Sequence, residues 1–123
     1  FLTMTSAYYR WSFLLYLLSD ASGSGHDNYI YGDKTPIPEG LLSFAKSVYD
    51  CLNVPNISLD IAYNGKEFYL IEFQAINFGS VCQVRANAYH RLTDNNWLLV
   101  KEKLSLEKVY ANSVGFYIKN NNL

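Results

Sequence analysis

Three side chains that carry oxygen ligands lie on two neighbouring segments of the sequence, and each segment alternates in polarity. Asp60 belongs to residues 57–63, and Glu72 and Gln74 belong to residues 67–74. Such alternation is typical of β-strands, in which every second side chain faces the same side. Two carboxylates and an amide oxygen on one rigid face would favour a hard divalent cation such as Mg²⁺, which prefers oxygen ligands and usually shares them with phosphate.

The pair Asn64-Gly65 separates these two segments and predicts a β-hairpin. A two-residue turn would pair Tyr63 with Lys66 and place the apolar rows of the two strands on opposite faces. We therefore expect a three-residue loop over residues 63–65, with Gly65 in the left-handed conformation and a bulge at the loop.

This register groups the polar residues of the hairpin on one face. Asp60, Glu72 and Gln74 are then expected together, with Phe68 and Leu70 beside them. Carboxylates set among apolar groups need a neutralising partner such as a metal ion. The alternative is that this face is the solvent side of an antiparallel sheet, where Asp, Glu and Gln are ordinary residues.

Other segments supply the elements that would position this hairpin. Apolar spacing over residues 41–52 predicts an amphipathic helix, with Pro38 and Glu39 in its first turn and Asn53 and Pro55 as its stop. Residues 8–18 favour a buried strand over a helix, and residues 19–38 form a long polar connection. Residues 105–118 predict a second helix that is capped by Ser105, and residues 120–122 should fray. The apolar stripe expected on this second helix consists of Leu106, Val109, Tyr110, Val114 and Tyr117.

Composition limits the kind of protein. The 123 residues include 10 basic and 11 acidic side chains, and half of the chain is hydrophobic, which supports a single domain over residues 1–123 with one core. The net charge of -1 gives no reason to bind nucleic acid or an anionic membrane. Cys51 and Cys82 form no Cys-x-x-Cys motif, so we expect free thiols in a reducing, cytoplasmic compartment. The predicted class is α+β, with a mainly antiparallel sheet and two principal helices.

The hairpin segment resembles the C-terminal lobe of the ATP-grasp superfamily. In that family a strand that carries Asp is followed by a turn and by a strand that ends in Glu-x-Asn. The matching residues are Leu59-Asp60-Ile61, Asn64-Gly65 and Tyr69-Leu70-Ile71-Glu72-Phe73-Gln74. The order of segments over residues 7–80 is also similar, because the family has an Arg-bearing strand, a connection and a helix before the Asp strand.

The resemblance implies roles for particular residues. Asp60 and Glu72 would hold Mg²⁺ that bridges the phosphates of ATP, and Gln74 would stand where the family has Asn. Gln supplies the same carbonyl oxygen, and Asn77 in the following loop could serve instead. Arg10, Leu70 and Glu72 would contact the nucleotide, with Arg10 also placed in the catalytic machinery at the phosphates. The alternative for Arg10 is an edge-strand residue or a structural ion pair.

The implied activity is that of a ligase that joins a carboxylate to an amine through an acyl phosphate. Arg85 is a candidate for binding the carboxylate substrate, with a surface arginine as the alternative. The partners would be ATP, Mg²⁺, a small-molecule or peptide carboxylate and the remaining lobe of a parent protein, because the family's N-terminal lobe has no counterpart before Arg10. Alone, the chain is expected to be inactive. The competing hypothesis is a non-catalytic protein-interaction module, for which the 11 tyrosines are suited.

Overall fold

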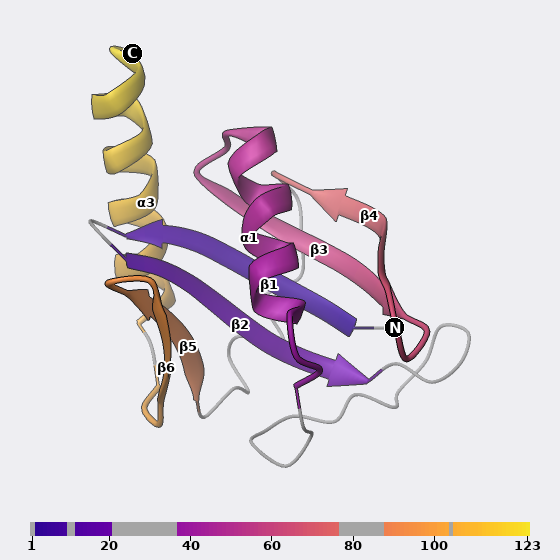
Figure 1. Ribbon diagram of the computed structural model, residues 1–123. Helices are drawn as coiled ribbons and strands as arrows, with labels where there is room; N and C mark the ends of the chain where they lie inside the picture. The colour runs from indigo at the N-terminus through magenta and orange to yellow at the C-terminus, as the bar shows by residue number, and fades with distance from the viewer. Residues whose placement is uncertain (1, 10–11, 21–36, 77–87, 104) are drawn as a thin grey trace.

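The chain forms an antiparallel sheet that lies between two helices (Figure 1). The computed structural model describes residues 2–9, 12–20, 37–76, 88–103 and 105–123. This architecture is α+β, as the sequence predicts. The elements of the described residues are β1 (Leu2–Tyr9), β2 (Ser12–Asp20), α1 (Leu41–Leu52), β3 (Asn56–Tyr63), β4 (Phe68–Gln74), β5 (Tyr89–Thr93), β6 (Asn96–Val100) and α3 (Leu106–Asn121).

The six strands follow the order β4-β3-β1-β2-β5-β6, and all neighbouring strands are antiparallel. Because β1 is antiparallel to both β2 and β3, these two strands run in the same direction, and α1 lies in the connection between them. The strand that carries Asp60 is therefore an interior strand, whereas the strand that carries Glu72 lies at an edge of the sheet.

The first two strands correct the prediction of one strand over residues 8–18. The segment is divided between β1 and β2, which pair as a hairpin whose innermost partners are Tyr9 and Ser12. The apolar run has no Gly, Pro, Asn or Asp at this reversal. Since such residues are what mark a turn in a sequence, hydrophobic periodicity alone did not reveal the reversal.

Helix α1 has the bounds that its apolar spacing predicts, and it forms the core with β3. Gly40 precedes the helix with a φ of 86°, so Pro38 and Glu39 lie before the first turn, not in it as expected. Asn53 ends the helix in the left-handed conformation, and its backbone N–H donates to the carbonyl of Tyr49. Burial of large aliphatic side chains stabilises a fold by about 1.5–3 kcal/mol each. The buried core consists of Leu41, Ala45, Tyr49, Ile57, Leu59 and Ile61.

Helix α3 packs on the opposite face of the sheet. Ile57 faces α1, so Asn56, one residue earlier in β3, points to the other face. There the hydroxyl of Ser113 donates a buried hydrogen bond of 2.6 Å to Oδ1 of Asn56. Figure 1 shows α1 crossing in front of the strands and α3 at the end of the sheet where β1 meets β2.

The contact face of α3 differs from the predicted stripe. Val109 and Ser113 are buried, whereas Val114 is 39% exposed. A polar residue on the buried face is explained by its bond to Asn56, which apolar spacing cannot reveal. The helix also continues to Asn121, where fraying was expected, because the side chains of Asn120 and Asn121 donate to carbonyls of the preceding turn. Ser105 is the N-cap residue as predicted, although its hydroxyl donates to Glu107 and caps no backbone N–H.

A further hairpin, formed by β5 and β6, was not predicted. Its turn residues Asp94 and Asn95 have φ angles of 49° and 65°, as a two-residue turn with both central residues in the left-handed region requires. The sequence did contain this signal, since Asp and Asn tolerate that conformation better than other residues with a side chain. Neither helix of the described residues combines the length and apolar character needed to cross a bilayer.

Candidate functional site

The turn between β3 and β4 is longer than the sequence predicts. Tyr63 pairs with Phe68, which leaves a four-residue loop in place of the expected three-residue loop. The side-chain oxygen of Asn64 accepts hydrogen bonds from the backbone N–H groups of Lys66 and Glu67 at 2.9 and 2.8 Å. These bonds stabilise the longer loop, since an Asn side chain can close a turn that backbone bonds alone would leave open. Gly65 has a φ of 93°, so its predicted left-handed conformation is confirmed.

A β-bulge within the ladder determines which residues of β4 share a face. The register shifts between Asp60 and Ile61, so that Asp60 pairs with Glu72, Ile61 pairs with Leu70, and Ile71 has no partner on β3. A bulge places two residues of one strand opposite one of the other. Without it, the four-residue loop would set Asp60 opposite Ile71. The bulge therefore sets Asp60 opposite Glu72 and restores the shared face that the hydrophobic pattern requires.

The side chains of Asp60, Glu72 and Gln74, which we call the carboxylate row, share the sheet face opposite α1. Asp60 lies directly across from Glu72, and Gln74 lies across from Ser58, two residues along β3. The expected grouping of these three residues is confirmed. Cross-strand partners have Cβ atoms about 4.5–5.5 Å apart, and like charges at that separation destabilise the sheet.

The polar contacts within the row leave several oxygen atoms open to a cation. Nε2 of Gln74 donates to Oε1 of Glu72 at 2.7 Å, so the carbonyl oxygen of Gln74 and the second oxygen of Glu72 keep their lone pairs. Asp60 is half-buried, and no other residue that the structure describes forms a hydrogen bond or ion pair with its carboxylate. Half-buried carboxylates gain stability from a cation or a donor. Two carboxylates and an amide oxygen fit a hard divalent cation.

Other predicted site residues are not brought to this face. Leu70 lies opposite Ile61 on the α1 side and is 38% exposed, so it is separated by the sheet from the carboxylate row. Phe68 also faces α1, where its ring contacts that of Phe44 with a centroid distance of 5.6 Å. The prediction that Phe68 and Leu70 flank the carboxylates is wrong, because the bulge reverses the faces of the residues between it and the turn. Arg10, Asn77 and Arg85 lie outside the described residues.

A polar cluster on β5 was missed at the level of sequence. Nη2 of Arg91 donates to the hydroxyl of Tyr89 at 2.6 Å, and this hydroxyl donates to Glu102 at 2.9 Å. Burial of Tyr89, which is 1% exposed, and its bond to Glu102 raise the pKa of the phenol, and the positive charge of Arg91 partly offsets this rise. The alternation of residues 89–93 before Asp94-Asn95 is the signal that could have located these side chains on a strand.

Arg91 shares a sheet face with the carboxylate row. The backbone register aligns Arg91 with Leu14, Leu14 with Ala7 and Ala7 with Asn56, so Arg91 and Asn56 lie on the same side of the sheet. Asp60 follows Asn56 by four residues and so faces that side as well. Nε of Arg91 is buried without a hydrogen-bond partner in the part of the chain that the structure describes. The face opposite α1 thus carries both carboxylates and a guanidinium with an open donor.

The described residues contain no group of three or more His, Cys, Asp and Glu side chains that could hold a metal ion. A cation at the carboxylate row would therefore take two carboxylates and the amide oxygen of Gln74 from this chain and complete its coordination with oxygens from elsewhere, as magnesium does with water and phosphate.

Comparison of the sequence and structure with protein families, curated proteins and solved structures finds no match in any of the three.

Proposed function

We propose that this chain is the metal-binding lobe of an ATP- and magnesium-dependent ligase that joins a carboxylate to an amine. The observation that carries the proposal is the direct cross-strand pairing of Asp60 with Glu72, on a face where Asp60 has no described partner. A fold that sets two carboxylates against each other pays an electrostatic cost, and a bound cation would offset it. Bound Mg²⁺ would supply charge neutralisation at the phosphate oxygens of the nucleotide.

In the proposed reaction the γ-phosphoryl group of ATP passes to a carboxylate oxygen of the substrate, which gives an acyl phosphate and ADP. The amine then attacks the acyl carbon, and phosphate leaves. The residues of this chain act by positioning: Asp60, Glu72 and Gln74 hold the metal, and Asn77 is a further candidate ligand. Arg10 is proposed to contact the phosphates and Arg85 the carboxylate substrate.

The site needs further groups to hold the base and ribose of ATP, and we propose that the remaining lobe of a parent protein supplies them. A cytoplasmic location is part of the proposal and is supported by Cys51, an exposed free cysteine that would suit a reducing compartment.

The test is calorimetric titration of the chain, and of the longest available parent protein, with a non-hydrolysable ATP analogue in the presence and absence of Mg²⁺. We expect magnesium-dependent binding by the parent and its loss in Glu72→Gln, because removal of one carboxylate halves the negative charge of the row. Glu67→Gln is the matched control, since Glu67 is an exposed carboxylate of the same hairpin that lies in the turn. Equal binding by wild type and Glu72→Gln would remove the row from the site.

A second candidate function is a non-catalytic interaction module, and the edge strand β4 favours it. The strand carries a single charged residue, and its apolar side chains are exposed: Tyr69 by 46%, Ile71 by 55% and Phe73 by 47%. An exposed edge of this kind can add a strand from another protein. A folded parent protein that binds no nucleotide with or without magnesium would favour this function over the ligase.

A further inference from the structure

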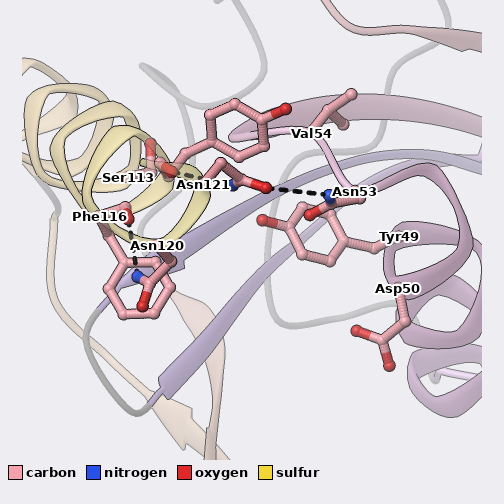
Figure 2. Close-up of a pocket in the computed structure, with 9 residues that line it drawn as sticks. Tyr49, Asp50, Asn53, Val54, Ser113, Phe116, Asn120 and Asn121 are labelled. Atoms are coloured by element: carbon pink, nitrogen blue, oxygen red, sulfur yellow. Dashed lines mark hydrogen bonds between the residues drawn. The ribbon is translucent and has the colours of Figure 1, made fainter. Parts of the chain in front are cut away.

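A pocket lies between the C-terminal ends of the two helices, away from the carboxylate row. It has a volume of about 190 Å³, and Figure 2 shows Tyr49 of α1 and Asn53, the residue that follows this helix, facing Phe116 and Asn120 of α3 across it. The volume corresponds to about six water molecules at about 30 Å³ each, so the pocket fits a ligand of about six non-hydrogen atoms.

The hydrogen bonds around the pocket use the side-chain amide nitrogens of the Asn residues as donors and leave their amide oxygens as acceptors. Nδ2 of Asn120 donates to the carbonyl of Phe116 at 2.7 Å, and Nδ2 of Asn121 donates to the carbonyl of Tyr117 at 2.9 Å. Because carbonyls only accept, these bonds fix the orientation of both amides. Oδ1 of Asn121 then faces Asn53, which must offer its Nδ2, at 3.4 Å (Figure 2).

The consequence is that the pocket presents acceptors to a ligand. Within the described residues, Oδ1 of Asn53 and Oδ1 of Asn120 receive no hydrogen bond. The hydroxyl of Tyr49 donates to the carbonyl of Pro55 at 3.4 Å, so this hydrogen is directed away from a ligand. A ligand that satisfies these atoms must carry N–H or O–H donors.

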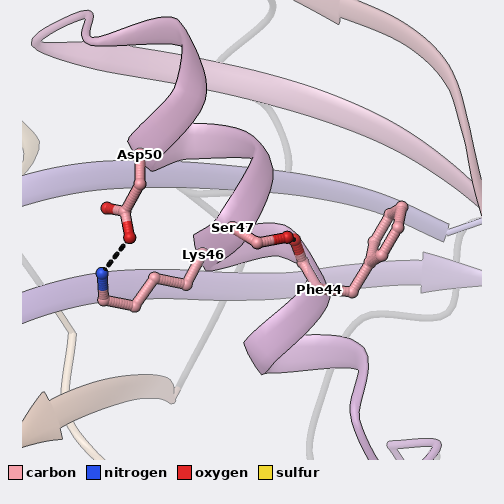
Figure 3. Close-up of polar contacts among 4 residues, drawn as sticks. All are labelled: Phe44, Lys46, Ser47 and Asp50. Atoms are coloured by element: carbon pink, nitrogen blue, oxygen red, sulfur yellow. Dashed lines mark hydrogen bonds and ion pairs between the residues drawn. The ribbon is translucent and has the colours of Figure 1, made fainter.

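A carboxylate at the pocket keeps one oxygen for a ligand. Asp50 lines it from the last turn of α1, where the helix dipole is negative and where the helix has no basic residue. Helix α3 also ends beside the pocket, and its last turn carries Lys119. Figure 3 shows that Lys46 pairs with Oδ2 of Asp50 from the preceding turn, which leaves Oδ1 of the carboxylate open. No Lys, Arg or His is among the described residues that line the pocket.

The walls of the pocket are aromatic. Tyr49, Phe116 and Tyr117 line it, and an aromatic ring attracts a cation to its face by about 0.5–1 kcal/mol at an exposed site. The same rings offer apolar contact to methylene groups. The pocket thus combines open amide oxygens, a carboxylate oxygen at the C-terminal end of α1 and aromatic walls, which together are complementary to one kind of group. We propose that this pocket binds an alkylammonium group, that is, a protonated primary amine on a short apolar chain.

The experiment is a titration of the full chain with n-butylammonium chloride at pH 7 and low salt, followed by two-dimensional amide NMR spectra. We expect saturable shifts at the amides of Asn53 and Asn120, with a Kd in the millimolar range. Butan-1-ol has the same shape without the charge and should bind at least tenfold more weakly. Equal binding of the alcohol would overturn the proposal.

Variants separate this site from general surface charge. Asp50→Asn should weaken butylammonium binding about fivefold or more, whereas Asp94→Asn should leave it unchanged. Asp94 is a matched control because it is an exposed carboxylate at the β5–β6 turn, in a left-handed conformation that Asn also tolerates. Phe116→Leu, which keeps an apolar wall and removes the ring, should weaken binding about twofold to threefold. Equal effects of the two Asp variants would refute the proposal.

An alkylammonium group can come from a free amine or from a lysine side chain of another protein. The two sources are distinguished by titration with the peptide acetyl-Gly-Lys-Gly-amide under the same conditions. Tighter binding of the peptide than of butylammonium would assign the pocket to a protein lysine, and weaker binding would assign it to a free amine. Absence of saturable shifts with both ligands would overturn the proposal. The inference is independent of the proposed ligase function, because no nucleotide or metal enters any arm of the test.

Discussion

Replacement of Asp60 by Asn should stabilise the chain when no divalent cation is present. Asp60 and Glu72 are direct cross-strand partners, so their Cβ atoms lie about 5 Å apart, and we take this separation for their charges. At that distance two unit charges repel by about 0.8 kcal/mol at the dielectric constant of water and by about 3 kcal/mol at an effective value near 20. Because Glu72 is exposed, the lower figure applies, and we expect a gain of about 0.5–1 kcal/mol in the free energy of unfolding.

Thermal unfolding followed by circular dichroism, in EDTA and at low ionic strength, measures this gain. For a chain of this length, 0.8 kcal/mol corresponds to a rise of about 3 °C in Tm. Glu72→Gln and the double variant complete a mutant cycle, in which the two gains should fall short of additivity by the repulsion they share. The gain should shrink in about 0.5 M salt, because salt screens charges near the surface.

Magnesium should reverse the order of the Tm values of the wild type and Asp60→Asn. If the carboxylate row binds the cation, magnesium will raise the Tm of the wild type and leave that of Asp60→Asn nearly unchanged. A fall in Tm of Asp60→Asn in EDTA, or full additivity in the mutant cycle, would refute the inference that the two carboxylates repel each other. An equal magnesium shift in both proteins would show that the cation binds elsewhere.

Three further predictions concern the supports of the sheet. Ser113→Ala should lower the free energy of unfolding by about 1–3 kcal/mol in urea titrations, because it leaves the buried oxygen of Asn56 without its donor; an unchanged midpoint would contradict this. Burial lowers the pKa of His90, so the stability that neutral His90 contributes should be present above about pH 6.5 and be lost as the pH falls through its folded-state pKa. The free energy of unfolding of a His90→Gln variant should therefore depend less on pH below about pH 6.5. Gly65→Ala should cost about 1 kcal/mol from backbone strain alone, because no atom lies within 4 Å of the added Cβ, and a loss comparable to that of a core deletion would point to a different turn conformation.

The sequence predicts best where a local pattern has one physical solution. Helix α1 has its predicted bounds because Leu41, Ala45 and Tyr49 recur on one face and Asn53 provides a left-handed stop. The grouping of the carboxylate row was also predictable, because a buried apolar row on β3 places Asp60 on the opposite face.

Prediction failed where the outcome depends on partners that are distant in sequence or on compensating irregularities. The hydrogen bond between Ser113 and Asn56 joins residues 57 positions apart, and it places a polar side chain where an apolar stripe was expected. Phe68 and Leu70 lie on the face opposite to the predicted one. The longer turn and the bulge at Ile71 each shift the strand register by one residue, and the hydrophobic pattern of the sequence shows only the combined effect of the two shifts. The sequence between β1 and β2 contains no Gly, Pro, Asn or Asp that would mark a reversal.

The bulge at Ile71 has a consequence for the solubility of the protein. Strand β4 is an edge strand with exposed apolar side chains, and a straight edge of this kind is a template on which further chains aggregate. A bulge bends the strand and strengthens its twist, so that a flat strand of an aggregate fits it less well than a partner strand that follows the bend. Deletion of Ile71 would keep Asp60 opposite Glu72 and leave the turn intact, yet it would remove this irregularity. By accommodating Ile71 as a bulge, β4 keeps the two carboxylates paired and also makes its exposed edge a poorer template for the flat strands of other chains.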